Sequence, residues 1–200
     1  MLRLIGFYNY TVILTYLSLF SGLVGMKYAH SDRLGMAILC LALSGVCDLF
    51  DGAVARTKKD RTQDEKNFGI QLDSLCDVIC FGVFPAVFLY FSGVDSLVGF
   101  AILVLYVLCA LIRLAFFNVL EINRQKNEGG CAKSYRGLPV TSAAIIYPFF
   151  YLVGLALPNG VTLAVYHILP FVMAILFVWD FSIPKFDIGK ILFRSKENSK

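Results

Sequence analysis

The sequence predicts an all-α integral membrane protein, built as a bundle of six membrane-spanning helices with a short interfacial helix at the N-terminus. Of its 200 residues, 58% are hydrophobic and only 16% are charged, against roughly 25% charged in a typical soluble domain. A soluble chain of this length cannot bury so much apolar surface, because its surface-to-volume ratio is too high. The 18 Phe and 10 Tyr also exclude a disordered chain.

Six stretches are long and apolar enough to cross a bilayer, for which a helix needs about 20 residues. They cover residues 5–26, 35–55, 70–93, 96–120, 138–157 and 161–180. The first stretch is too long for the core of a signal peptide and lacks a small-residue cleavage site, so we expect it to be retained. Its opening, Leu2–Tyr10, mixes Arg3 and Asn9 with apolar residues. This mixture favours a short helix that lies in the membrane interface.

Lys and Arg are unevenly distributed among the connections between these spans. Fifteen of the eighteen would lie on one side of the membrane, in the N-terminus, the loops at 56–66 and 121–136, and the tail after residue 180. The opposite side has only Lys27 and Arg33. Because positively charged loops stay in the cytoplasm, we expect a protein of the cell membrane with both termini and the active site facing the cytoplasm.

The net charge of +4 is therefore a consequence of membrane topology and suits contact with anionic lipid headgroups. The basic residues lack the interleaved aromatic residues of a nucleic-acid-binding surface, so no nucleic-acid partner is expected. We expect one membrane domain over residues 1–182, followed by a basic cytoplasmic tail over residues 183–200.

Four aspartates lie inside the ends of predicted spans, where an ionised carboxylate is energetically costly. Asp48 and Asp51 are at the end of the second span, and Asp73 and Asp77 are at the start of the third. Residues three or four apart share one face of a helix, so each pair forms a stripe. The loop between the two spans is short, which makes them antiparallel neighbours. We therefore expect the four carboxylates to converge just inside the cytoplasmic interface.

Converging carboxylates repel one another unless cations lie among them. An all-oxygen set of this kind suits Mg²⁺ or Mn²⁺, and two such ions about 3.5–4 Å apart are a common arrangement for phosphoryl transfer. Gly52 and Ala55 keep the same helix face thin, so a bulky anion can approach the backbone, and Arg56 lies one turn beyond Gly52. Two alternatives remain open: ordinary ion pairs with the basic 56–66 loop, and an intramembrane cation transporter.

At these positions the sequence resembles the CDP-alcohol phosphotransferase family. The resemblance rests on the pattern Asp48-x-x-Asp51-Gly52-x-x-Ala55-Arg56 followed by Gly69-x-x-x-Asp73-x-x-x-Asp77. Twelve residues separate the two halves of the pattern, which is longer than is usual in the family. The longer gap and the flanking segments FG and LDSL resemble the phosphatidylserine synthase branch.

The resemblance implies a membrane enzyme that uses an alcohol to displace CMP from a CDP-linked lipid. By family analogy, the four aspartates hold two divalent ions, and Asp77 is the general base that accepts the proton of the attacking hydroxyl. The CDP-lipid-binding positions implied in the same way are Gly52, Ala55, Arg56 and Gly69. The family resemblance also implies a homodimer.

A second group of polar residues is predicted to form the acceptor pocket. Arg113 lies inside the fourth span, where it needs an anionic or carbonyl partner; the alternative is an ion pair with one of the four aspartates. The segments RLAFFN and YRGLPV resemble those of phosphatidylserine synthases, in which comparable groups lie near the acceptor. The predicted acceptor-binding residues are Arg113, Asn118, Lys133, Tyr135 and Arg136.

The resemblance favours L-serine as the acceptor, with a phosphatidylserine-type lipid and CMP as products. A buried carboxylate is costly unless it is paired, and an Arg side chain can bind the serine carboxylate with two parallel hydrogen bonds. Glycerol 3-phosphate and inositol phosphate remain alternative acceptors, because their phosphates also suit a basic pocket. Acyl-ester and isoprenoid-ether lipids both remain open as donors.

Overall fold

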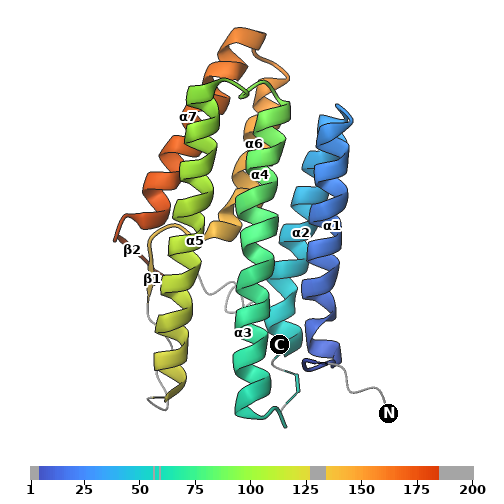
Figure 1. Ribbon diagram of the computed structural model, residues 1–200, viewed down its shortest axis with the longest axis vertical. Helices are drawn as coiled ribbons and strands as arrows, with labels where there is room; N and C mark the ends of the chain where they lie inside the picture. Colours follow the sequence, from blue (N-terminus) through green and yellow to red (C-terminus); the bar gives the residue numbers. More distant parts are fainter. Residues whose placement is uncertain (1–4, 56, 59, 127–133, 185–200) are drawn as a thin grey trace, which may run out of the picture.

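A bundle of helical rods forms the main body of the computed structural model, which describes residues 5–55, 57–58, 60–126 and 134–184 (Figure 1). The helices are α1 (Ile13–His30), α2 (Leu34–Ala55), α3 (Gln63–Asp77), α4 (Phe84–Phe91), α5 (Leu97–Lys126), α6 (Ala143–Gly154) and α7 (Asn159–Val178). A π-helical segment, η2 (Val78–Val83), joins α3 to α4 without a break, so these elements form one long rod. Two short strands, β1 (Ser134–Arg136) and β2 (Ser182–Pro184), pair antiparallel.

Five helical segments are long and apolar enough to cross a membrane. They are Tyr10–His30, Leu34–Ala55, Gln63–Phe91, Leu97–Asn123 and Asn159–Val178. The segment predicted to span over residues 138–157 holds a shorter apolar helix, Val140–Gly154. Its length is about 22 Å, less than the roughly 30 Å of a bilayer's hydrocarbon core. The predicted all-helical membrane bundle is thus confirmed, whereas the described residues provide five helices of spanning length in place of the predicted six.

The short helix is limited by the residues at its two ends. Pro139 precedes the 3₁₀ turn η3 (Val140–Ser142) in an extended conformation, and α6 ends at Gly154 before the turn that leads to α7. Proline removes a backbone donor and disfavours a helical conformation in the residue before it. The start of this helix is therefore fixed by local sequence rather than by the length of the apolar run.

The predicted interfacial helix over Leu2–Tyr10 is wrong for residues 5–9, the part of it that the structure describes. These residues form bends and extended chain, and Gly6 has a φ of +114°, outside the helical region. The extended Asn9 then accepts a hydrogen bond from the backbone N–H of Thr11, so helical structure starts at η1 (Tyr10–Val12). An N-cap at Asn9 thus sets the start of the first rod.

The rod that contains α3 begins at Gln63, earlier than the predicted residue 70. Its start is fixed by a capping box, in which the Thr62 side chain accepts from the Glu65 backbone N–H and the Glu65 side chain accepts from the Thr62 backbone N–H. Helix α5, a separate helix, continues to Lys126, beyond the predicted residue 120. The polar turns of these two helices extend the same end of the bundle (Figure 1).

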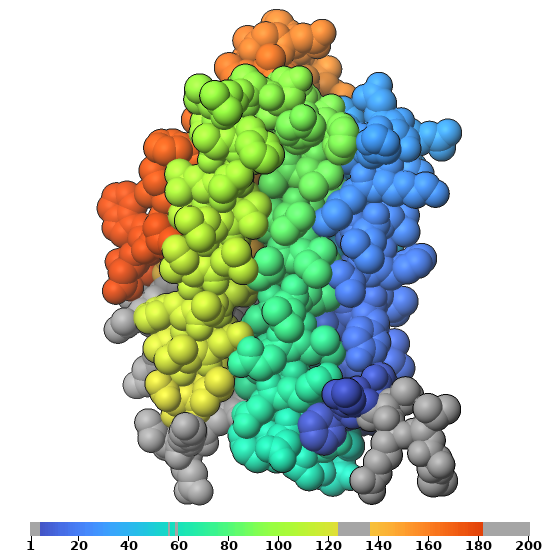
Figure 2. Space-filling view, viewed as in Figure 1, coloured from blue at the N-terminus to red at the C-terminus, as the bar shows by residue number. Residues whose placement is uncertain are grey.

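Small polar side chains and glycines allow α1 to pack closely against its neighbours. The Ser18 and Ser44 hydroxyls are 2.7 Å apart and join α1 to α2. A Cβ at Gly25 would overlap the Phe84 ring and lie 2.9 Å from Cys40 Cβ. Figure 2 shows α1, the α3–α4 rod and α5 packed side by side. Close packing of small residues is a common way for membrane helices to associate.

The connections lie at two opposite ends of the bundle. The N-terminal segment, the α2–α3 loop and the end of α5 lie at one end, and the turns that follow α1, α4 and α6 lie at the other (Figure 1). Assignment of the first end to the cytoplasm stays a prediction. So does the division into a domain over 1–182 and a tail over 183–200, because residues 185–200 lie outside the described part of the chain.

Candidate active site

Three of the four predicted aspartates converge between α2 and α3. One carboxylate oxygen from each of Asp48, Asp73 and Asp77 lies within 4.8 Å of the other two. Asp77 is only 7% exposed, while Asp48 and Asp73 are half-buried. Because Asp73 and Asp77 are one turn apart on α3, both carboxylates face the end of α2 that carries Asp48.

Asp51 lies one turn further along α2, outside this group of three. Its Oδ2 atom accepts a hydrogen bond of 3.3 Å from the Thr15 hydroxyl of α1. Thr15 itself is buried. Helix α1 therefore orients the fourth carboxylate, a contact that sequence spacing within α2 and α3 did not reveal.

A cavity of about 300 Å³ opens beside the carboxylates. Helix α2 and helix α3 form its walls together with the first turns of α1 and the end of α5. Its lining residues are Thr11, Val12, Thr15, Asp51, Gly52, Ala55, Arg61, Lys66, Gly69, Ile70, Asp73 and Glu121. The sequence-predicted Gly52, Ala55 and Gly69 thus lie around the same space as Asp51 and Asp73.

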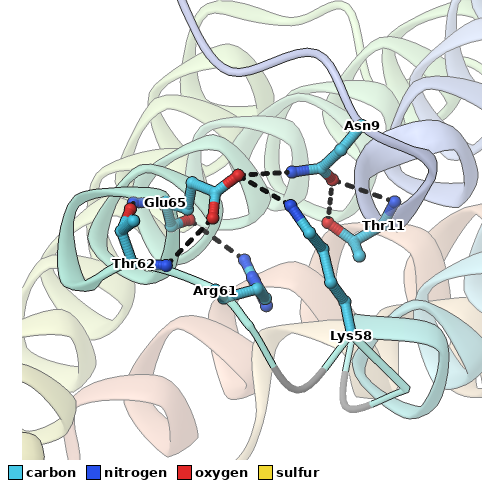
Figure 3. A network of polar contacts seen from close by, with 6 residues as sticks. All are labelled: Asn9, Thr11, Lys58, Arg61, Thr62 and Glu65. Carbon is cyan, nitrogen blue, oxygen red and sulfur yellow. Dashed lines mark hydrogen bonds and ion pairs between the residues drawn. The ribbon is translucent and has the colours of Figure 1, made fainter.

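Glu65 is the centre of a network of polar contacts that includes two of the lining residues, Thr11 and Arg61 (Figure 3). Its Oε1 atom accepts from Lys58 Nζ at 2.8 Å and from Asn9 Nδ2 at 3.4 Å. Its Oε2 atom accepts from the Thr62 backbone N–H at 2.9 Å. The hydrogen bond to Glu65 raises the pKa of the Lys58 ammonium. One carboxylate therefore connects the N-terminal segment, the α2–α3 loop and the start of α3. The sequence contains a signal for this role, the capping-box pattern from Thr62 to Glu65.

The aspartate group fits a divalent cation. Its ligands are all carboxylate oxygens, the type that Mg²⁺ and Mn²⁺ prefer. Asp73 Oδ1 is buried and has no hydrogen-bond partner in the described structure. Among described residues, no Lys or Arg forms an ion pair with Asp48, Asp73 or Asp77. Carboxylates so close together repel one another when ionised, and a metal ion held among them would offset this repulsion.

Of the predicted acceptor residues, the structure describes the side chains of Arg113 and Asn118. Lys133 lies outside the described residues, and of Tyr135 and Arg136 only the backbone, in β1, is described. The predicted CDP-lipid-binding residue Arg56 also lies outside the described residues. Neither Arg113 nor Asn118 is among the described residues that line the cavity.

Arg113 is 7% exposed and lies on α5, beside the turn that follows β1. A Cβ on Gly137 in this turn would be 3.5 Å from Arg113 Nε. The guanidinium carbon lies 5.5 Å from the centroid of the Phe117 ring, and Nε has no hydrogen-bond partner in the described part of the chain. The alternative of an ion pair with one of the four aspartates does not occur among the described residues.

Asn118 connects α5 to α3. Its Oδ1 atom accepts from the Ser74 hydroxyl at 2.7 Å, and its Nδ2 atom donates to Gln71 Oε1 at 3.5 Å. Asn118 and Ser74 are both buried. Since Ser74 follows Asp73 directly, this contact fixes the part of α3 that carries the aspartates.

Comparisons with known proteins place this site in a family. Residues 8–179 match the CDP-alcohol phosphatidyltransferase family. The chain is 36% identical over 143 residues to the archaetidylserine synthase of Methanothermobacter thermautotrophicus, a match that covers 71% of this chain and 57% of that protein. It is 35% identical over 141 residues to a CDP-diacylglycerol–serine O-phosphatidyltransferase of Helicobacter pylori, covering 70% of this chain and 55% of that protein.

A protein of the latter name from Saccharomyces cerevisiae is 38% identical over 114 residues, covering 56% of this chain and 40% of the yeast protein. The chain thus spans about half the length of the curated relatives it matches. No solved structure matches it. Because the family match extends over most of the chain, from residue 8 to residue 179, the protein belongs to the CDP-alcohol phosphatidyltransferase family.

Proposed function

We propose that the protein transfers a phosphatidyl group, or its archaeal-type diether counterpart, from a CDP-lipid to the hydroxyl of L-serine and releases CMP. The observation that carries this proposal is the convergence of Asp48, Asp73 and Asp77 within 4.8 Å beside a cavity between membrane helices. Family membership supports the displacement of CMP. The names of the relatives, which act with serine or make archaetidylserine, support serine as the acceptor.

Two Mg²⁺ or Mn²⁺ ions are the proposed cofactors, held by Asp48, Asp51, Asp73 and Asp77. When bound, these cations would offset the charge of the diphosphate and make CMP a better leaving group. The unpartnered Oδ1 of Asp73 and the all-oxygen ligand set support this assignment.

In the proposed reaction, the serine hydroxyl oxygen attacks the phosphorus that carries the lipid. The bond between this phosphorus and the oxygen that bridges it to CMP breaks, and CMP leaves with that oxygen. The hydroxyl proton passes to Asp77, the proposed general base. Asp77 is the most buried of the three converging aspartates, so it is shielded from bulk water, as suits a positioned base.

The CDP-lipid is proposed to bind with its diphosphate in the cavity and its tails in the bilayer. Gly52, Ala55 and Gly69 leave room for the nucleotide part, and Arg56 is the proposed diphosphate contact of the family pattern. Both substrates reach the site from the basic end of the bundle, which we assign to the cytoplasm. A homodimer is proposed from family resemblance.

On the acceptor side, Arg113 is the proposed partner of the serine carboxylate. Its buried guanidinium forms no ion pair among the described residues, which supports a role in binding an anion. The proposal extends to Lys133, Tyr135 and Arg136 by resemblance. Asn118 lies on the same helix as Arg113, and its hydrogen bonds to Ser74 and Gln71 support a positioning role.

The proposal is tested by measuring CMP release from a CDP-lipid when each acceptor is offered alone to the purified protein with Mg²⁺. Serine should support turnover, whereas glycerol 3-phosphate and inositol phosphate should not. A reaction without acceptor and the Asp77→Asn variant are the controls. Turnover with a phosphorylated acceptor but none with serine would reject the acceptor. Absence of CMP release with every acceptor would instead favour a cation transporter or a scaffold.

A further inference from the structure

The structure assigns a role to Arg61, which is not part of the family pattern: we propose that its guanidinium binds the diphosphate of the CDP-lipid. This inference rests on the proposed function and adds a substrate-binding residue to it. Arg61 lies in the loop between α2 and α3 and lines the same cavity as Asp51, Gly52 and Asp73. Three observations support the role: the space that Gly69 provides, the unused donors of the guanidinium, and the network that holds the loop.

Gly69 provides the space that the Arg61 side chain occupies. A Cβ at residue 69 would lie 2.6 Å from Arg61 Nη2, closer than real Cβ atoms approach a neighbour. The guanidinium therefore lies against the backbone of α3, one turn before Asp73. Gly69 and Asp73 are one helical turn apart, a rise of about 5.4 Å, and Arg61 lines the same cavity as this proposed metal-binding carboxylate.

Among the described residues, hydrogen bonds occupy only part of the donor capacity of the Arg61 guanidinium. A guanidinium has five N–H donors, and Nη2 donates to the Glu65 backbone oxygen at 3.0 Å. Nε is buried and has no hydrogen-bond partner in the described structure. No carboxylate among the described residues forms an ion pair with Arg61. The nearby Glu65 carboxylate instead accepts hydrogen bonds from Lys58, Asn9 and Thr62.

The Glu65 network holds this loop in place before any substrate binds (Figure 3). Arg61 is followed directly by Thr62, the N-cap of α3, and the capping box with Glu65 fixes the backbone at this point. Contacts of Glu65 with Lys58 and Asn9 attach the loop to the N-terminal segment. A side chain that is held in its binding position loses less conformational entropy when a ligand arrives.

The mixture of charges in the cavity identifies the ligand class. The acidic lining residues would repel a free anion, and the basic ones would repel a free cation. The acidic residues are Asp51, Asp73 and Glu121, and the basic ones are Arg61 and Lys66. A diphosphate bound together with a divalent cation suits both groups, because the cation lies with the carboxylates and phosphate oxygens accept from the guanidinium. Arg is well suited to this contact, since its planar fork makes two parallel hydrogen bonds to a phosphate.

The test compares wild-type protein with Arg61→Ala, Arg61→Lys and the control Arg33→Ala. Arg33 is exposed and lies at the opposite end of the bundle. We expect Arg61→Ala to raise the KM for CDP-lipid, and the Kd for soluble CDP with Mg²⁺, by about 10- to 100-fold, the range for loss of charge-assisted hydrogen bonds. The KM for serine should stay unchanged. The KM and Kd of Arg61→Lys should lie between those of the wild type and Arg61→Ala, because Lys keeps the charge but lacks the planar guanidinium. Arg33→Ala should behave as wild type.

A double-mutant cycle tests the contact with Gly69 separately. Gly69→Ala should weaken CDP binding in the wild-type background, because the new Cβ displaces the guanidinium. In the Arg61→Ala background the same change should have a smaller effect, because only the room that Gly69 leaves for the nucleotide is then lost.

Two results would overturn the inference: an unchanged CDP affinity in Arg61→Ala, or a KM change confined to serine. Equal effects of Gly69→Ala in both backgrounds would also contradict it. If the wild-type protein releases no CMP from CDP-lipid, the proposed function fails, and the CDP affinities still decide whether Arg61 is a diphosphate contact.

Discussion

Asp48, Asp73 and Asp77 each place a carboxylate oxygen within 4.8 Å of the other two, a grouping that could hold a metal ion. Each of the three comes from a helix whose backbone is fixed by neighbours: Asp48 from α2, which packs on α1, and the other two from α3, which Asn118 anchors to α5. The site is thus built on rigid elements rather than on a loop, which is the arrangement that holds metal ligands most accurately.

Alanine at Asp48 or Asp73 is expected to lower CMP release by more than about 100-fold. Loss of groups that only orient metal ligands already costs about 10- to 100-fold, so loss of a ligand should cost more. A chelator should abolish activity of the wild-type protein, and excess Mg²⁺ or Mn²⁺ should restore it. The measurement is CMP release before chelation, after chelation and after return of the metal. Activity that survives excess chelator would contradict the two-ion proposal.

Asp77→Asn is expected to separate binding from catalysis. The amide keeps the shape of the carboxylate but cannot accept the hydroxyl proton, and a positioned general base contributes about 10²–10⁴-fold to a rate. Turnover should therefore fall by that amount, while the Kd for CDP in the presence of Mg²⁺ changes much less. Titration of CDP into purified protein checks the second part. A variant that binds CDP poorly yet turns over normally would reject the base assignment.

At the scale of elements, the contact of α1 with α2 and α4 depends on side chains that are small. Gly25 is buried where α1 meets Phe84 of α4 and Cys40 of α2, and any side chain there would overlap the Phe84 ring. A densely packed interface cannot absorb an added methyl group without shifting its neighbours.

Gly25→Ala is therefore expected to destabilise the protein by about 1–3 kcal/mol, the usual cost of overpacking. The matched control is Gly160→Ala on α7, because a Cβ at Gly160 would meet no atom within 4 Å. The measurement is the thermal unfolding midpoint of both variants in detergent. Gly25→Ala should lower the midpoint and Gly160→Ala should not. Equal thermal midpoints for the two variants would contradict the prediction and show that the α1 interface accommodates a methyl group at residue 25.

At the scale of the whole molecule, the helices gather the cavity and the described basic residues Lys58, Arg61 and Lys66 at one end of the bundle. In the proposed reaction, this arrangement would bring soluble serine and CMP to the same end as the diphosphate of a lipid whose tails stay in the bilayer. It predicts a definite orientation, because basic connections remain in the cytoplasm.

Membrane-impermeant labelling of single cysteines in intact cells tests this orientation. In a background without the six native cysteines, a cysteine at Ser92 or Asp95 should be labelled from outside. A cysteine at Asp60, in the α2–α3 loop, should be labelled only after the cells are opened. Equal labelling of both positions from outside would reject the predicted topology.

The sequence alone determined the features that depend on local composition and spacing. Long apolar runs place the chain in a membrane. Four aspartates were predicted to share a site, because helical periodicity puts each pair on one face and a short loop brings the two helices together. Of these four, Asp48, Asp73 and Asp77 do converge, and Asp51 lies outside the group. The family pattern was readable for the same reason, since its members lie on two consecutive helices.

Only the tertiary structure decided the contacts between segments that are distant in sequence or irregular in conformation. Thr15 of α1 donates a hydrogen bond to Asp51 of α2, and Ser74 of α3 donates one to Asn118 of α5. The hydropathy of the sequence does not predict which polar side chains pair between helices. The starts of the first rod at η1 and of α3 at Gln63 depend on local capping hydrogen bonds, at Asn9 and in the capping box of Thr62 and Glu65. These bonds outweigh the apolar pattern. Arg61 became visible as a ligand-binding candidate because its position depends on the space above Gly69, and that space exists only when the loop folds back onto α3.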